Sequence, residues 1–177
     1  ASNTKEFWHA NKSTWEEFVQ RPMEGLATEL ESEFGEAKLW RPQRDVRFSR
    51  DKSPYKTRQG LTFGDNSSVG YYLQLGAQGV HLGGGFHGLS REQISRYRDG
   101  VDDGRSGEAL RRCVDELARS GWDIVGDRLK SRPRGVSADH PRLELLRFTS
   151  LGAERLESPT VAAKDEFSTR AKSYFRE

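Results

Sequence analysis

Residues 41–56 combine dense charge with interleaved apolar side chains, and we call this stretch the basic segment. It contains six cations and two carboxylates, so its net charge is six minus two, or +4, against +2 for the whole chain of 177 residues. The other residues are therefore slightly acidic. Because the cations are interleaved with Val46, Phe48 and Tyr55, the segment indicates a fixed anion site more than a disordered basic tail.

The composition of the basic segment predicts a site for phosphate or carboxylate, since the planar guanidinium of arginine can bond both groups through paired N–H donors. In this interpretation Asp45 and Asp51 orient the cations, and Tyr55 donates a hydrogen bond. If the protein is an enzyme, these three residues are its candidate acid, base and assisting group. The cations predicted to contact the ligand are Arg44, Arg47, Lys52 and Lys56.

A purely structural interpretation of the same segment stays open. Asp45 and Asp51 would then neutralise neighbouring arginines and pin an irregular stretch to a sheet. We expect residues 45–48 to be a strand piece, in which successive side chains such as Arg44 and Asp45 face opposite sides. The charges would then not all point into one pocket.

Residues 130–135 form a second basic stretch. Pro133 and Gly135 favour a stiff loop that can hold Arg132 and Arg134 in place. We predict that these two arginines form the opposite wall of the anion site. The alternative is a solvated surface loop.

Other chemistry has little support. Gly83, Gly84 and Gly85 lack the spacing of a nucleotide-binding loop and predict a strand closely approached by another backbone, or a bulge. His81 and His87 would lie roughly 20 Å apart on a strand, too far for one metal ion. The sequence has no serine-hydrolase, zinc-protease or cysteine–histidine motif. No metal and no cofactor is therefore predicted.

Two further side chains are expected to be structural. His140, beside Asp139, is expected to belong to a helix cap instead of acting as a general base. The single cysteine, Cys113, excludes an internal disulfide and a cysteine-rich zinc site. It shares a predicted helical face with Leu110 and Val114, so we expect it to be buried.

The elements that position these residues begin with a long helix whose apolar side chains recur every three or four positions from Trp15 to Phe34. We expect Gly35 to end this helix, Pro22 to bend it, and a short helix capped near Thr4 to precede it. Further helices are predicted after Ser90, at residues 107–120, near residues 139–146 and after Ser158. Residues 99–106 are predicted to be a polar loop.

Short strands are predicted between these helices. They cover residues 38–40, 45–48, 57–63, 69–75, 80–86 and 122–125, with extended chain near 129–130 and at 147–156. Residues 76–79 would join two of them in a hairpin. Because strands and helices do not alternate regularly, we predict an α+β fold with a mainly antiparallel sheet packed with amphipathic helices. The length favours a single domain covering residues 1–177.

No apolar run approaches the roughly 20 residues that cross a bilayer, and no signal peptide is visible at the start. We therefore expect a soluble, cytoplasmic protein without a membrane partner. The chain begins without Met, and we expect natural residues to be missing at its ends. The composition does not predict an oligomeric state.

Residues 44–56 resemble the signature of a widespread bacterial family, domain-of-unknown-function family 2461, whose pattern is RDxRFSxDKxPYK. Here they read Arg-Asp-Val-Arg-Phe-Ser-Arg-Asp-Lys-Ser-Pro-Tyr-Lys. The resemblance extends to residues 5–8, 11–12, 83–86, 127–130, 132–135 and 139–141, and so covers nearly the whole chain. It implies a bacterial cytoplasmic setting and no agreed activity.

Three functions follow from these observations. The first is a binding module for a small phosphorylated or carboxylated molecule, and the second is an enzyme that acts on such an anion. The third is a nucleic-acid-binding protein, suggested by cations near Tyr55, Tyr71 and Tyr72. A net charge of +2 from 29 basic and 27 acidic residues disfavours a broad basic face. We rank an anion site first, without deciding between binding and catalysis.

Overall fold

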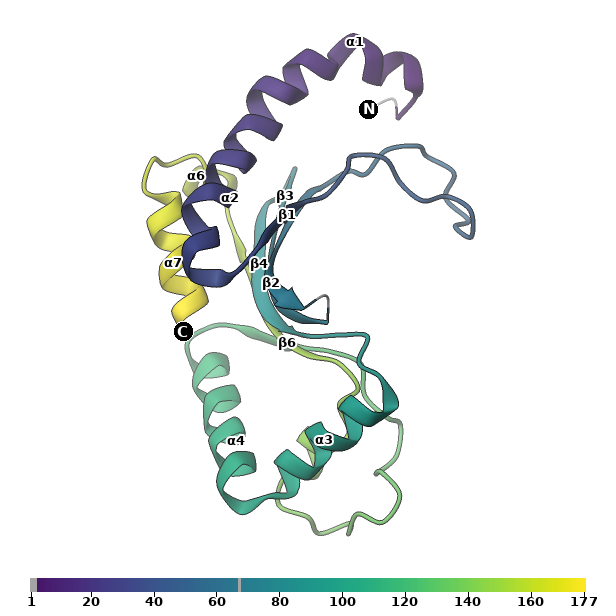
Figure 1. Ribbon diagram of the computed structural model, residues 1–177, viewed down its shortest axis with the longest axis vertical. Coiled ribbons are helices and arrows are strands. Elements are labelled where there is room, and N and C mark those ends of the chain that lie inside the picture. Colours follow the sequence, from purple (N-terminus) through teal and green to yellow (C-terminus); the bar gives the residue numbers. More distant parts are fainter. Residues whose placement is uncertain (1–2, 67) are drawn as a thin grey trace. The chain divides into compact units, whose positions relative to one another are not determined.

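The computed structural model describes residues 3–66 and 68–177, without the side chains of residues 65 and 66 (Figure 1). The strands are β1 (Ala37–Leu39), β2 (Gln59–Asn66), β3 (Val69–Gly76), β4 (Gly79–Phe86), β5 (Asp123–Val125) and β6 (Leu151–Glu157). They form one antiparallel sheet of six strands in the order β1-β2-β3-β4-β6-β5. The predicted α+β class is confirmed.

Helices precede and follow the sheet strands along the chain. They are α1 (Lys5–Trp15), η1 (Glu16–Gln20), α2 (Arg21–Phe34), α3 (Arg91–Asp102), α4 (Gly104–Arg119), α5 (Leu143–Leu146), α6 (Pro159–Ala162) and α7 (Phe167–Arg176). Within the described residues, none combines the length and apolar composition needed to cross a bilayer.

Contacts divide the chain into two compact units, which we describe separately. Unit 1 comprises residues 1–65, 71–82 and 156–176, and unit 2 comprises residues 66–70, 83–155 and 177. The basic segment belongs to unit 1, whereas Arg132 and Arg134 belong to unit 2. A joint site between these two stretches therefore stays a prediction, as does a single domain.

The predicted long N-terminal helix is confirmed, and it has no separate short helix before it. α1, η1 and α2 follow one another without a break, beginning at the cap Thr4 and ending at Gly35, whose φ of 89° suits glycine. The irregularity lies just before Pro22 as a wide π turn, in which the Arg21 N–H donates to the Glu16 carbonyl. Because proline has no N–H and crowds the carbonyl four residues earlier, a wider turn fits there better than a regular one.

The core of unit 1 is an aromatic cluster between α2, α7 and the sheet. The ring of Phe175 lies 5.2 Å from that of Phe34, 5.9 Å from that of Phe63 and 4.9 Å from that of Tyr71. Leu30 beside it is fully buried. These large side chains supply much of the apolar area that unit 1 removes from water.

The predicted polar loop at residues 99–106 is wrong. α3 runs to Asp102 and α4 begins at Gly104, because the carboxylate of Asp103 accepts the N–H groups of Arg105 and Ser106 and so caps α4. The helix predicted after Ser158 is divided into α6 and α7. Cys113 is exposed on α4 instead of buried, since the buried face of that helix turns other residues inward.

The triple glycine in β4 behaves as predicted at Gly85. Its φ is +154°, and a Cβ there would lie 2.5 Å from the Cα of Gly152 and 3.0 Å from the carbonyl carbon of Leu151. The backbone of β6 approaches too closely for any side chain. Gly85 is therefore explained by packing between strands.

Candidate functional site

The basic segment leaves β1 and returns to β2 as a long loop, visible in blue in Figure 1. Its base is paired, since the Arg44 N–H donates to the Pro54 carbonyl at 2.9 Å and the Lys56 N–H donates to the Pro42 carbonyl at 2.8 Å. Beyond Arg44 the pairing stops. The segment is thus a hairpin-like arm with an irregular end.

The strand piece predicted at residues 45–48 is absent from this arm. The carboxylate of Asp45 accepts the N–H of Arg47 at 3.2 Å, and that of Asp51 accepts the N–H of Ser53 at 2.9 Å. Such local turns occupy the backbone donors that a strand ladder would use. The alternation of charges between two faces, expected from a strand, does not apply here.

Tyr55 lies at the base of the arm as a packing residue. Its ring stacks on that of Trp8, with centroids 4.6 Å apart and planes 16° apart. Its backbone is bonded in both directions by the side-chain amide of Asn3, at 2.9 Å and 3.2 Å. These contacts attach the beginning of the chain to the arm, and they give Tyr55 a structural role beside its predicted catalytic one.

Both carboxylates of the basic segment are held by its own cations. Asp45 receives two hydrogen bonds from the guanidinium of Arg47, at 2.9 Å and 2.6 Å, and this lowers its pKa. Asp51 accepts the Ser53 hydroxyl at 2.6 Å and is also paired with Arg44. The Ser53 hydroxyl and N–H, followed by Arg44, lower the pKa of Asp51 to about 2.

These pKa shifts bear on catalysis. A general acid or base works best with a pKa near the working pH. Asp45 and Asp51 are instead kept ionised well below neutral pH, so neither is poised to hold and release a proton. Their geometry matches the structural interpretation, in which each neutralises an arginine.

The predicted ligand cations differ in exposure. Arg44 and Lys56 are half-buried and bonded within the arm, the latter to the carbonyl of Arg41 at 2.7 Å. Burial lowers the pKa of Lys56, which also lies over the ring of Trp40. Arg47, although paired, has a side chain that is 76% exposed. The fourth cation, Lys52, is exposed, and its amine donates to a backbone carbonyl at 2.9 Å.

Two further cations were missed by the sequence prediction. Arg41 and Arg50 are exposed, and their side chains make no hydrogen bond or ion pair with any part of the chain that the structure describes. Phe48, between them in sequence, is 97% exposed. The signal that could have identified them is the Asp-x-Arg and Asp-x-Ser spacing. It assigns Asp45 and Asp51 to local turns, so these carboxylates form no ion pair with Arg41 or Arg50.

The turn at Asp51 makes a testable pH prediction. Because its pKa in the folded protein lies below the ordinary 3.8, its bonds stabilise the arm above that value and are lost as the pH falls toward about 2. We expect the carboxyl carbon of Asp51 to titrate in NMR spectra with a midpoint near 2. Ser53→Ala should raise that midpoint, whereas Ser49→Ala should not. A wild-type midpoint near 3.8 would contradict the geometry.

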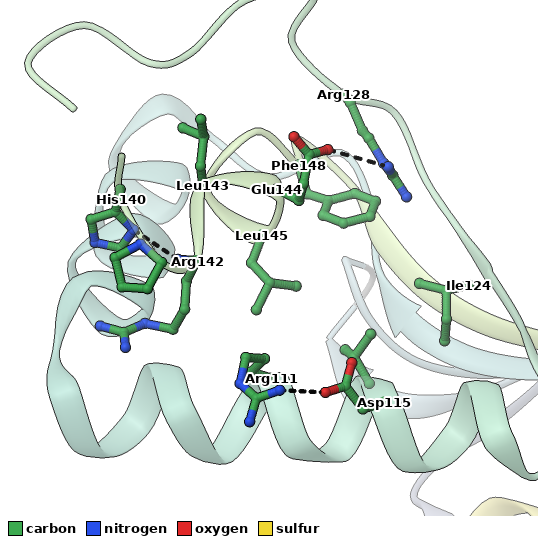
Figure 2. A pocket seen from close by; sticks show the side chains of 12 residues that line it. Arg111, Asp115, Ile124, Arg128, His140, Arg142, Leu143, Glu144, Leu145 and Phe148 are labelled. Carbon is green, nitrogen blue, oxygen red and sulfur yellow. Dashed lines mark hydrogen bonds and ion pairs between the residues drawn. The ribbon is translucent and has the colours of Figure 1, made fainter. Parts of the chain in front are cut away.

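Unit 2 contains a pocket of about 370 Å³, which we call the α4–α5 pocket (Figure 2). α4 contributes Arg111, Val114 and Asp115, β5 contributes Ile124, and residues between 128 and 148 contribute the rest. The pocket is within the usual size range for small-molecule sites, about 300–1,000 Å³.

His140 at one side of this pocket has a structural role. Its Nδ1 accepts the N–H of Arg142 at 3.0 Å, so its Nε2 carries the proton and donates to a carboxylate oxygen of Asp102 at 2.9 Å. Both ring nitrogens are therefore occupied. The ring fixes the turn before α5 and leaves no free nitrogen for a general base. The predicted helix cap is not formed, since the N-cap of α5 is Arg142 and no side chain bonds there.

The stiff loop at residues 130–135 has the expected form. Pro133 is buried, its carbonyl accepts the N–H of Val136 at 3.2 Å, and Gly135 has a φ of 86°. Arg132 and Arg134 are exposed and do not line the α4–α5 pocket. Their predicted part in anion binding stays a prediction. Across the residues described, no three His, Cys, Asp or Glu side chains cluster as metal ligands would.

Comparison with known proteins identifies a family but no characterised relative. A family model described as "Conserved hypothetical protein (DUF2461)" matches residues 1–177. No curated protein and no solved structure matches the chain. The predicted family is therefore confirmed, and the function has to be inferred from the chain itself.

Proposed function

We propose a function for this chain from its own residues, since it belongs to the DUF2461 family of conserved hypothetical proteins. The chain is a binding protein for a phosphorylated or carboxylated ligand, which the basic segment captures. The observation that carries this proposal is the charge left on the arm once its internal ion pairs are counted. Asp45 and Asp51 neutralise Arg47 and Arg44, and four further cations keep a net charge of +4.

The arrangement of these cations favours a ligand with more than one anionic group. Arg41, Arg50 and Lys52 are exposed at different points of the arm, so a single small anion would not engage all three. A ligand that carries several phosphates or carboxylates could engage more than one of these cations. The internal turns hold the arm in one conformation, which reduces the entropy lost on binding.

Catalysis by the same site has less support. The two candidate acid–base residues are bonded and ionised, and Tyr55 is stacked at the base of the arm. We therefore propose binding over reaction. From the family resemblance we also propose the bacterial cytoplasm as the setting.

A nucleic acid is a second candidate ligand, favoured by one specific observation. Phe48 is almost fully exposed between cations, and single-stranded nucleic acids bind where bases stack on aromatic rings beside basic side chains. The low net charge of the whole chain still disfavours a broad nucleic-acid surface.

Calorimetric titration with inorganic pyrophosphate, citrate and oligothymidylate tests the proposal, at low and at physiological ionic strength. The test variant combines Arg41→Gln, Arg50→Gln and Lys52→Gln. Its affinity for pyrophosphate or citrate should fall by about threefold to a hundredfold, because three exposed charge contacts at roughly 0.2–1 kcal/mol each sum to about 0.6–3 kcal/mol. Binding should weaken as salt is added.

A matched control lowers the net charge equally and elsewhere, with Arg91→Gln, Arg105→Gln and Lys164→Gln, all at exposed positions. Equal affinities of the two triple variants would overturn the proposal. If only oligothymidylate bound, and Phe48→Ala abolished that binding, the nucleic-acid candidate would be favoured. If adding Arg132→Gln and Arg134→Gln to the basic-segment triple variant lowered the affinity for pyrophosphate or citrate further, the second wall predicted from the sequence would be supported.

A further inference from the structure

The α4–α5 pocket offers a second site, independent of the basic segment. One side of it is apolar and rigid, since Leu145 and Phe148 belong to the buried core cluster of unit 2 and Val114 and Ile124 pack against that cluster. Figure 2 shows Leu145 and Ile124 pointing into the space above α4. An apolar ligand body placed here would leave water without displacing core residues.

Most polar side chains around the pocket are already engaged. Arg111 bonds Glu108 at 2.6 Å and Asp115 at 2.5 Å. Arg142 donates from Nε to the Val101 carbonyl at 2.7 Å and from Nη2 to the Asp102 carbonyl at 2.8 Å, at the end of α3. These groups form the wall, and the donors named here are engaged within the protein.

Arg128 is the exception at the rim. Its guanidinium carbon lies 4.2 Å from the centre of the Phe148 ring, and its nearest carboxylate oxygen, on Glu144, is 3.7 Å away. That separation exceeds a hydrogen bond. Glu144 is instead bonded by Arg147 at 3.0 Å and 3.2 Å. Arg128 therefore keeps its N–H donors, with 42% of its side chain exposed.

The charges around the pocket consequently favour an anion. Asp115 is bonded by Arg111. Glu144 forms an ion pair with Arg128 at 3.7 Å but is bonded more closely by Arg147, so this shared pair compensates the charge of Arg128 only in part. A guanidinium packed over an aromatic ring keeps a limited range of orientations, and its planar fork of donors suits a carboxylate or phosphate.

We propose that the α4–α5 pocket binds a small amphiphilic anion with a single acidic head group. Its carboxylate or phosphate accepts hydrogen bonds from Arg128, and its apolar body lies against Ile124, Leu145 and Phe148. This class differs from the multiply charged ligand proposed for the basic segment, because here the exposed donors of one guanidinium stand beside an apolar surface. Phenylacetate, phenyl phosphate and neutral phenylacetamide are suitable probes, since they share a ring and differ in the head group.

NMR titration of the full chain with each probe tests the proposal. With phenylacetate or phenyl phosphate, the amide shifts should concentrate at Arg128, Ile124 and residues 143–148. Comparing the affinities of these two probes identifies the preferred head group. Phenylacetamide should bind roughly tenfold more weakly or worse, because it forgoes the charged hydrogen bonds. Shifts that concentrate outside the pocket, or no shift with any probe at millimolar concentration, would overturn it.

Variants separate the head-group contact from the apolar one. Arg128→Gln should weaken binding of the preferred anion about tenfold or more while leaving phenylacetamide within about twofold, because only the anion uses the charge. Ile124→Phe, which fills the pocket, should weaken all probes. Arg105→Gln, an exposed change in the same unit, and the basic-segment triple variant should bind like the wild type. An equal loss of anion and amide in Arg128→Gln would contradict the assigned contact.

Discussion

Replacing Gly107 by alanine is expected to destabilise unit 2 by about 3–4 kcal/mol, the sum of overpacking and a weakened charged hydrogen bond. A Cβ at this position would lie 2.8 Å from the carbonyl carbon of Val101, closer still to its oxygen, and 2.5 Å from Nε of Arg142. Val101 is 1% exposed, so its backbone has nowhere to move. α4 would have to separate from α3, and the bonds from Arg142 that close the end of α3 would lengthen.

Gly100 supplies a matched control for this change. It lies inside α3, and a Cβ there would meet nothing within 4 Å. Gly100→Ala should therefore stabilise by up to about 1 kcal/mol through helix propensity. Urea unfolding measures the two changes, and hydrogen exchange in α3 and α4 assigns them to unit 2. If Gly107→Ala raised the free energy of unfolding as Gly100→Ala should, the close approach of α3 to Gly107 would be contradicted.

The elements predicted from sequence were those whose signal is local and repeated. The apolar spacing from Trp15 to Phe34 and the cap at Ser90, a full capping box with Gln93, need no knowledge of distant residues. Asp103 shows the limit, because a short polar stretch is compatible with a loop or with a cap between two helices. The bonds from Arg142 to the carbonyls of Val101 and Asp102, which are 41 and 40 residues away in sequence, favour the second, and the local pattern does not contain them.

The two candidate sites also differ in whether their contacts are local in sequence or join distant residues. The turns at Asp45 and Asp51 are local and could be read from spacing, although the strand prediction for residues 45–48 overlooked them. The α4–α5 pocket joins side chains from position 111 to position 148. The central contact, Arg128 over the Phe148 ring, depends on an isolated bridge between those two residues. No spacing in a single sequence predicts that pairing, so the sequence predicts extended chain near residues 129–130 but no contact for Arg128.

Phe175→Ala is expected to cost unit 1 about 3–5 kcal/mol, as is usual when a core phenylalanine is truncated. Phe175 is 6% exposed, and its ring contacts those of Phe34, Phe63 and Tyr71, so its removal leaves a cavity that three elements would have to close. Phe48→Ala removes the same atoms at a 97% exposed position and should change stability by less than about 0.5 kcal/mol. Chemical denaturation of both variants measures the contrast. A large loss in Phe48→Ala would mean that this ring is covered in solution, and it could then not serve as an exposed stacking surface for a nucleic acid.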